Sequence, residues 1–402
     1  MPEILADVYK KGILAGHFSR TDDGATAYTY ASTYLETSSK PLSPTLPLST
    51  DSYRREGGAL PPFFTGLLPE GRRLTGLRKH LKTSADDELG MLIAVGEDTV
   101  GDVQIVSPNT QPAQLVIPDA GELIQSEDFQ TITFSELINR HSIIDPAAIP
   151  GVQDKVSGKM LTLPLRSSED FYLLKISPPE YPQVVENESF FLKAASRIHA
   201  FPQVASHRLV HDATGRSGIL IRRFDRYIDE HGIAHRLAAE DACQLSNRYP
   251  SDKYLLTAEQ CSEALLTQVF SPRIAAPEIF RQFVYAWLTG NGDLHAKNLS
   301  IVENRKGQYE LSPIYDIPST APYGDKSMAL LLSGKKDGLS RRRFLTFAHN
   351  IGVSSRVAEH VLEEVLTGTE HLAEQAREEL PFDSHRMKEL LKVLKNRRRS
   401  LL

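Results

Sequence analysis

The sequence has little cysteine, no excess of basic charge and no long hydrophobic run. Its two cysteines, Cys243 and Cys261, are too few for a disulfide framework or a cysteine-based zinc site, and we expect both in the core. The 51 acidic residues outnumber the 46 basic ones, which excludes a general nucleic-acid-binding protein. The sequence has neither an apolar run long enough to span a bilayer nor a signal-peptide pattern at its start, so we expect a cytoplasmic protein without membrane contact.

The remaining composition is that of an ordinary multidomain protein. Hydrophobic residues make up 41% of the 402 residues, and this length corresponds to two or three domains. A polar, proline-containing segment at 107–119 predicts a seam, strand patterns dominate 171–224, and helical patterns dominate beyond 238. We therefore predict an α+β protein in which two lobes flank a cleft. The predicted units are residues 1–110, 111–228 and 229–402.

The most informative segment is Asn291–Asn298, which reads NGDLHAKN and follows a predicted helix. Asp293 precedes Asn298 by five positions, and Asp316 follows eighteen residues after Asn298. The turn-forming residues 303–307 predict a hairpin that returns the chain, so the three side chains can meet. The alternative is an ordinary polar loop between a helix and a strand.

Phosphoryl transfer requires this set of residue types. An aspartate orients the hydroxyl nucleophile, and hard oxygen ligands such as those of Asn298 and Asp316 suit Mg²⁺. The kinase catalytic loop has the same spacing between aspartate and asparagine. Lys297 or His295 can then steady charge on the transferred group.

Lys175 lies in the middle of the apolar segment Phe171–Ile176. A buried lysine needs a charged partner, and Glu188, thirteen residues on, opens the next predicted helix. Glu186 is a competing partner, and a solvent-facing lysine on an edge strand is the simpler alternative.

Two further segments are weak on their own. Residues 151–159 carry glycines and lysines suited to a phosphate but match no standard phosphate loop, so an ordinary turn is the alternative. Residues 223–225 follow a predicted strand at 218–224 and are, from local sequence alone, only a charged strand end.

Taken in chain order, segments 42–52, 96–103, 151–155, 223–226 and 315–317, together with the Asp293 loop, resemble the HipA family of bacterial toxin kinases. The resemblance runs through nearly the whole chain. It implies a two-lobed, protein-kinase-like α+β fold with an added N-terminal α/β subdomain and a helical C-terminal lobe. It also implies that Asp293 is the catalytic base, assisted by Lys297, and that Asn298 and Asp316 bind Mg²⁺. The implied ATP contacts, with Glu188 supporting Lys175, are Gly151, Val152, Gln153, Asp154, Lys155, Lys175, Arg223, Phe224, Asp225 and His295, with Phe224 at the adenine and Asp225 at the ribose.

The family also implies a biological role. Its members are serine/threonine kinases that phosphorylate aminoacyl-tRNA synthetases, stop translation and favour dormancy. A small helix-turn-helix antitoxin of the HipB type neutralises them and carries the complex to operator DNA. We therefore expect an ATP- and Mg²⁺-dependent protein kinase with an antitoxin partner.

Two positions depart from the family pattern. Ala148 occupies the position of an autophosphorylated serine, for which Ser142 and Ser157 are distant substitutes, and Arg222 replaces a common hinge glutamate. Two alternatives stay open. One is a small-molecule phosphotransferase similar to aminoglycoside and choline kinases, and the other is a catalytically silent, ATP-binding co-repressor. The basic segments 334–343 and 388–399 read as solvated surface rather than as a DNA contact.

Overall fold

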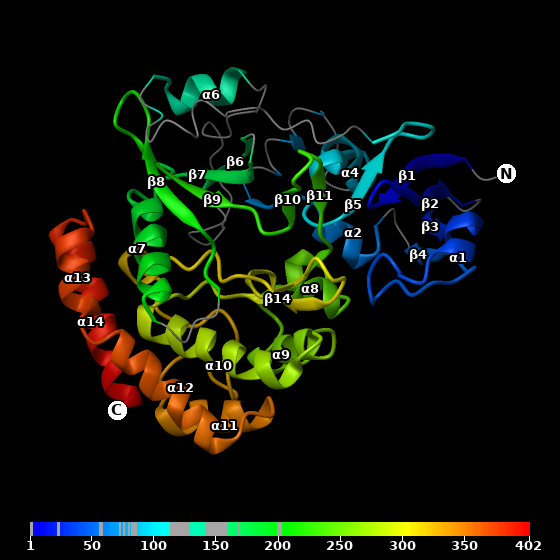
Figure 1. Cartoon of the computed structure of the whole chain (residues 1–402). Coiled ribbons are helices and arrows are strands. Elements are labelled where there is room, and N and C mark those ends of the chain that lie inside the picture. The colour runs from blue at the N-terminus through cyan, green and yellow to red at the C-terminus, as the bar shows by residue number, and fades with distance from the viewer. Residues whose placement is uncertain are drawn as a thin grey trace.

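The computed structural model describes residues 3–21, 25–55, 59–71, 74, 77–78, 81, 87–112, 129, 131–140, 160–167, 169–198 and 203–402. Within these residues the chain forms an N-terminal domain, a middle sheet and a helical lobe (Figure 1). Three separate hydrophobic clusters hold them together. No helix in these ranges is long and apolar enough to span a bilayer.

The N-terminal domain is built on an antiparallel sheet of five strands in the order β4-β3-β2-β1-β5. Its core is aromatic, with Phe18, Tyr28 and Phe64 in mutual ring contact. The described elements are β1 (Ile4–Lys10), β2 (Ile13–Arg20), β3 (Thr26–Tyr30), α1 (Ser32–Thr37), β4 (Tyr53–Arg55), α2 (Pro62–Gly66), α4 (Glu88–Val95), the 3-10 turn η2 (Gly96–Asp98) and β5 (Val103–Val106).

The middle unit is an antiparallel sheet in the order β6-β7-β9-β8, with a helix on each face. Leu174 and Leu220 belong to the same hydrophobic cluster as Phe134 of α6, whereas Ile219 and Ile221 belong to the cluster that contains Phe191 of α7. Figure 1 shows the two helices on opposite sides of the sheet. The elements are α6 (Phe134–Arg140), β6 (Leu161–Arg166), β7 (Phe171–Ile176), α7 (Val184–Ser196), β8 (His207–His211) and β9 (Ser217–Arg222).

The C-terminal lobe is mainly helical and is organised around α10 (Pro272–Thr289). Phe280 and Phe283 on α10 pack against Phe347 on α11. The other helices are α8 (Ala242–Leu245), α9 (Ala258–Leu266), α11 (Arg341–Asn350), α12 (Ser355–Gly368), α13 (Leu372–Glu379) and α14 (Ser384–Leu401), with 3-10 turns η5 (Pro250–Asp252), η6 (Ala296–Asn298) and η7 (Ala321–Tyr323).

Two small sheets border this lobe. One pairs β10 (Arg226–Ile228) with β11 (Ala234–Arg236). The other has the order β12-β13-β14, formed by β12 (Ala239–Asp241), β13 (Ser300–Glu303) and β14 (Tyr309–Leu311). The β13–β14 pair is the hairpin predicted between Asn298 and Asp316.

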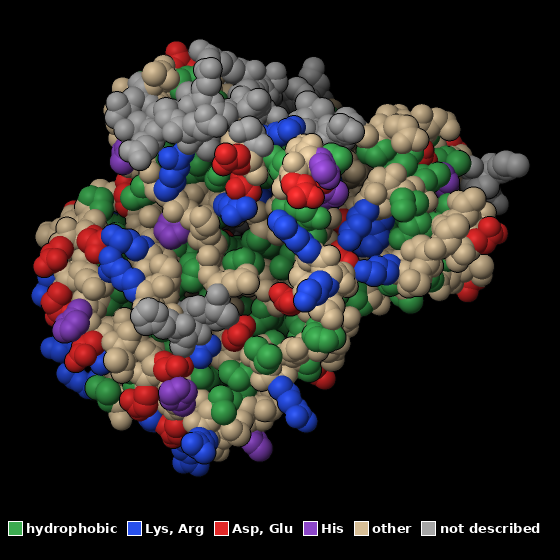
Figure 2. Space-filling model, viewed as in Figure 1, with side chains coloured by type: hydrophobic (Ala, Val, Ile, Leu, Met, Phe, Trp, Pro, Cys, Tyr) green, Lys and Arg blue, Asp and Glu red, His purple; other side chains and the backbone are tan. Residues whose placement is uncertain are grey.

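The described elements follow the predicted order closely. The predicted strand at Phe171–Ile176 is β7, and the predicted helix from about residue 187 begins three residues earlier, at Val184. The strand expected to reach residue 224 ends at Arg222. Both cysteines are buried and unpaired, as expected of core residues. The face in Figure 2 carries charged side chains of both signs, in keeping with the small net charge of −5.

Candidate active site

The loop after α10 is fixed by two glycines. Gly290 ends the helix with φ +76°, a left-handed conformation that glycine adopts without a steric penalty. A Cβ atom on Gly292 would lie 2.5 Å from the carbonyl oxygen of Ser327 and 2.6 Å from Oγ1 of Thr320. The loop therefore presses directly against the segment that follows Asp316.

Asp293 is held at the centre of this loop by a closed set of hydrogen bonds. The Tyr254 hydroxyl donates to Oδ1 of Asp293 over 3.0 Å. The side-chain amide of Asn298 donates to the Asp293 carbonyl over 2.9 Å, and the Asp293 N–H donates to the side chain of Asn291 over 2.8 Å. These bonds fix the direction of the carboxylate and of the Asn298 amide together.

Asp316 lies on a segment that is bonded to this loop on both sides. Before it, the Tyr315 hydroxyl donates to the Lys297 carbonyl over 2.8 Å. After it, the Thr320 N–H donates to the Gly290 carbonyl over 2.9 Å. Asp316 itself has φ +55°, which is strained for a residue with a side chain. The predicted return of the chain through the hairpin thus brings the Asp316 segment against the loop.

Lys175 joins this segment to the middle sheet. Its ammonium lies 2.8 Å from Oε1 of Glu188 on α7 and 2.9 Å from Oδ1 of Asp316, so the predicted ion pair with Glu188 forms and Glu186 is not its partner. Burial alone would lower the pKa of Lys175, but the two carboxylates outweigh it and raise that pKa above its ordinary value. The lysine is therefore a cation at neutral pH, held between two lobes.

The partners of Lys297 lie outside the set formed by Lys175, Glu188 and Asp316. Its ammonium lies 3.0 Å from Oδ2 of Asp241 and donates to the Gly66 carbonyl of the N-terminal domain over 3.0 Å. His295 is only 3% exposed and packs edge-on beneath the Tyr254 ring. Lys297 is therefore paired with Asp241, and His295 is buried against Tyr254. The expectation that one of them steadies charge on a transferred group stays a prediction.

In the hinge segment 223–225, the backbone of Phe224 and the side chains beside it make different contacts. Within the part of the chain that the structure describes, neither the N–H nor the C=O of Phe224 has a hydrogen-bond partner. The Phe224 ring contacts the Tyr315 ring, with centroids 5.5 Å apart. These free backbone groups suit the edge of a planar base.

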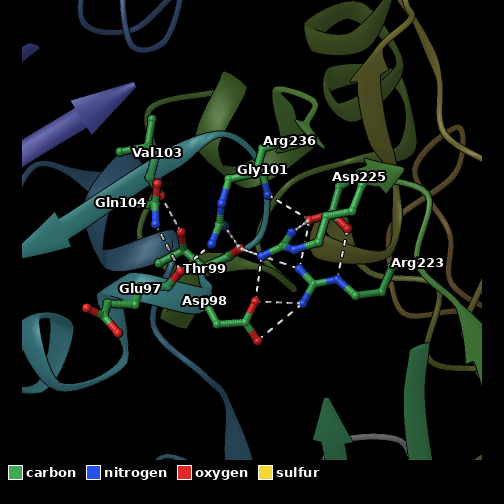
Figure 3. Close-up of polar contacts among 10 residues, drawn as sticks. Glu97, Asp98, Thr99, Gly101, Val103, Gln104, Arg223, Asp225 and Arg236 are labelled. Carbon is green, nitrogen blue, oxygen red and sulfur yellow. Dashed lines mark hydrogen bonds and ion pairs between the residues drawn. The ribbon is translucent and has the colours of Figure 1, made fainter. Parts of the chain in front are cut away.

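The side chains beside Phe224 point elsewhere. Asp225 is 3% exposed, and both of its oxygens accept hydrogen bonds from Arg223 (Figure 3). Asp225 also pairs with Arg226 and accepts the Gly101 N–H over 2.9 Å. The carboxylate of Asp225 is thus bonded to two arginines and to the N-terminal domain, and its predicted contact with a ribose stays a prediction.

Several sequence expectations lie outside the described residues. These are the phosphate loop at 151–155, with Gly151, Val152, Gln153, Asp154 and Lys155, and the positions Ala148, Ser142 and Ser157. Arg222 is described. Its side chain is half exposed and pairs with Asp170 over 2.7 Å.

In the basic segment 388–399, Arg397 has a structural role. Arg397 is 5% exposed, donates to the Trp287 carbonyl over 2.7 Å and lies 4.0 Å from the centroid of the Trp287 ring. In the other basic segment, Arg341 pairs with Glu359 and Glu363. These side chains serve the packing and the ion pairs of the helical lobe.

The donor set suits Mg²⁺ together with a nucleotide rather than a metal held by protein alone. Among the described residues no group of three His, Cys, Asp or Glu side chains could hold a metal ion. Asn298 and Asp316 instead offer one amide and one carboxylate, which are the few hard oxygens that Mg²⁺ takes when phosphates supply others. These two residues would hold the ion.

Tyr254 and Asp98 were missed by sequence reasoning. Tyr254 precedes Asp293 by 39 residues, and Asp98 precedes Arg223 by 125. No local motif marks either residue, and only the fold brings each to its partner.

Comparison with known proteins gives two family matches. Residues 6–106 match the HipA N-terminal domain, and residues 147–373 match the HipA-like C-terminal domain. The chain is 27% identical to "Putative kinase Y4mE" of Sinorhizobium fredii, over 86% of each chain. It is 25% identical to the serine/threonine-protein kinase toxin HipA of Shewanella oneidensis, over 85% of this chain and 86% of that one.

A solved structure shows the same fold. A chain in the complex of HipA, HipB and operator DNA from Shewanella oneidensis MR-1 matches with a TM-score of 0.76 and 20% identity, over 97% of both chains. The α+β, two-lobed kinase-like architecture with an added N-terminal domain is therefore that of HipA. Since the C-terminal family model alone matches more than half of the chain, the protein belongs to the HipA family.

Proposed function

We propose that this protein is a serine/threonine protein kinase that transfers the γ-phosphate of ATP to a hydroxyl group of a protein. The observation that carries the proposal is the position of Lys175 between Glu188 and Asp316. A strand lysine held by a carboxylate on the next helix, beside a metal-binding aspartate, is the arrangement that kinases use to hold nucleotide phosphates. The relative named as a serine/threonine-protein kinase toxin supports the same activity.

The geometry supports the following proposed roles. Asp293, oriented by the Tyr254 hydroxyl, accepts a hydrogen bond from the incoming hydroxyl and aims its oxygen at the phosphate. Lys175 binds phosphate oxygens, and the backbone of Phe224 binds the adenine edge. Mg²⁺, when bound, neutralises charge on the phosphates, and Asn298 and Asp316 provide its protein oxygens. We also propose that the backbone of residues 151–155 binds the phosphates of ATP.

The proposed partners come from the relatives. The solved Shewanella HipA is in a complex with HipB and operator DNA, which supports a helix-turn-helix antitoxin for this chain and an indirect link to DNA. We propose a translation-related protein, such as an aminoacyl-tRNA synthetase, as the substrate, with growth arrest as the result.

The direct test is a transfer assay with the full chain, γ-labelled ATP, Mg²⁺, a proteome extract and an aminoglycoside panel. Label in protein that is lost with Asp293→Asn supports the proposal. The exposed Asp51, between α1 and β4 of the N-terminal domain, provides the matched control Asp51→Asn, which should keep full transfer.

Two outcomes would replace the proposal. Label in the small molecules alone would make the chain a small-molecule phosphotransferase. Tight binding of ATP without any transfer would make it a nucleotide-binding co-repressor.

A further inference from the structure

We propose that Asp98, on the N-terminal domain, is a positioning residue of the nucleotide site, acting through Arg223 on the hinge backbone at Phe224. The inference rests on the proposed kinase function and adds to it a residue from a different domain. It also assigns to the N-terminal domain a direct part in nucleotide binding.

The first observation is the set of contacts around Asp98, which ends the 3-10 turn η2 (Figure 3). Its Oδ1 lies 3.1 Å from Nη1 of Arg223 and 2.6 Å from Nη2 of Arg226. The next carbonyl, that of Thr99, accepts from Arg226 over 2.6 Å. One turn of the N-terminal domain therefore holds both arginines that flank the hinge.

The second observation is charge balance in a buried place. The side chains of Arg223 and Arg226 are 5% and 0% exposed, and the only carboxylates that pair with them among the described residues are those of Asp98 and Asp225. A buried charge that loses its partner is strongly unfavourable. Removing the charge of Asp98 would leave two buried cations with one carboxylate, and the arginines would have to move or admit water.

The third observation links the arginines to the nucleotide site. Arg223 and Asp225 are bonded to each other through two parallel hydrogen bonds of 2.9 and 2.8 Å, so they fix the chain on both sides of Phe224. The Arg223 N–H also donates to the Phe171 carbonyl at the start of β7, the strand of Lys175. Movement of Arg223 would therefore shift the free backbone groups of Phe224.

The turn at residues 98–101 of the N-terminal domain is closely packed against its neighbours. Gly101 donates its N–H to Asp225 and has φ +87°. A Cβ atom at this position would lie 3.2 Å from the backbone nitrogen and oxygen of Ala239. The turn is thus seated closely against the helical lobe, which holds Asp98 in place.

The same domain reaches the catalytic loop and the hairpin. Lys40 lies 2.7 Å from Oε1 of Glu303, on the hairpin that leads to Asp316, and Lys11 pairs with the same carboxylate. Gly66 accepts the Lys297 ammonium beneath the loop. The contact of Asp98 differs from these because its partner Arg223 is next to Phe224, at the proposed adenine site.

The test measures binding of a non-hydrolysable ATP analogue with Mg²⁺ by calorimetry, and KM for ATP and kcat in the transfer assay. Asp98→Asn should weaken binding and raise KM by about 2- to 30-fold, with kcat at saturating ATP changed less than about twofold. Asp98→Glu, which keeps the charge, should recover most of the affinity.

The matched control is Arg236→Gln, in the same interface. Among the described residues Arg236 donates hydrogen bonds to the Thr99 and Glu97 carbonyls but makes no hydrogen bond or ion pair with Asp98 or Asp225, although its charge lies close enough to act on the same cluster. It should lower the melting temperature without changing KM for ATP, which separates a loosened interface from a displaced hinge.

The outcomes are distinct. Equal affinity for the analogue in Asp98→Asn and wild type, whatever the melting temperature, would overturn the role of Asp98. An equal rise in KM in Arg236→Gln would also overturn it, because any weakening of the interface would then suffice. Failure of the wild-type protein to bind the analogue would instead overturn the proposed kinase function.

Discussion

The Nζ atom of Lys175 lies 2.9 Å from Oδ1 of Asp316, although 141 residues separate them in the chain. The lysine belongs to the middle sheet and the aspartate to the segment after the β13–β14 hairpin. The pair therefore links the two lobes directly. Its two members are the residues to which we assign phosphate and metal binding.

Lys175→Met should abolish phosphate transfer and weaken ATP binding by at least tenfold. It should also destabilise the fold by about 3 kcal/mol, because Glu188 and Asp316 would face each other without their cation. Calorimetry and urea unfolding measure the two effects. Lys193→Met is the control, since Lys193 pairs at the surface with Glu379, and it should change stability by less than about 0.5 kcal/mol. Normal ATP affinity in Lys175→Met would contradict the assignment.

Asp293→Asn should stop transfer while leaving ATP affinity within about twofold, because the amide keeps the size of the carboxylate but cannot orient the nucleophile. Tyr254→Phe should reduce kcat by about tenfold, since it removes the hydroxyl that fixes Asp293. Single-turnover kinetics with γ-labelled ATP provide the measurement. Transfer at the wild-type rate in Asp293→Asn would exclude this residue as the base.

Lys297 should prove structural. Lys297→Met should lower the free energy of unfolding by about 3 kcal/mol, because it leaves Asp241 buried without its cation. The double variant Lys297→Met/Asp241→Asn should recover part of this loss and retain measurable transfer. Urea unfolding and the transfer assay test both statements. If the double variant is as stable as wild type yet wholly inactive, Lys297 has a chemical role after all.

Stability should fall as the pH rises from about 5 to 8, in part because of Glu240. Burial raises the pKa of Glu240 from 4.5 to about 8, although the Ser43 hydroxyl, 2.6 Å away, opposes this rise. The folded state therefore holds a proton that the unfolded chain releases, so this contribution is present below pH 4.5 and is lost as pH rises towards 8.

Glu240→Gln should flatten this dependence, by at most about 1.4 kcal/mol per pH unit. Comparing urea unfolding of the two proteins across that range cancels the contributions of other groups. Parallel curves for wild type and variant would contradict the raised pKa.

Local sequence indicated the parts of the site that depend on neighbours in the chain, although it left Glu186 and a solvent-facing Lys175 as alternatives. The pairing of Lys175 with Glu188 follows from a strand and the helix after it, and the return to Asp316 follows from a hairpin turn. Such contacts need only the correct secondary structure, which the alternation and the turn residues determine.

The roles of Asp225 and Lys297 could not be predicted in the same way. Asp225 is saturated by a turn at residues 98–101, and Lys297 is held by Asp241 and Gly66. These partners come from another domain or another sheet, and docking between domains depends on surface shape that no periodicity encodes. Local sequence therefore could not show that the charges of Asp225 and Lys297 are paired with residues of another domain or sheet, and their predicted roles at the nucleotide stay predictions.

The positive φ of Asp316 sets a limit on which residues this position can accept. Glycine would relieve about 1 kcal/mol of backbone strain there. It would also leave Lys175 with a single counterion and deprive the site of its acidic oxygen. A glycine variant should therefore fold with a relaxed local backbone but lack the carboxylate that connects the two lobes. The residue with the least backbone strain at this position is thus one that cannot bind the metal or pair with Lys175.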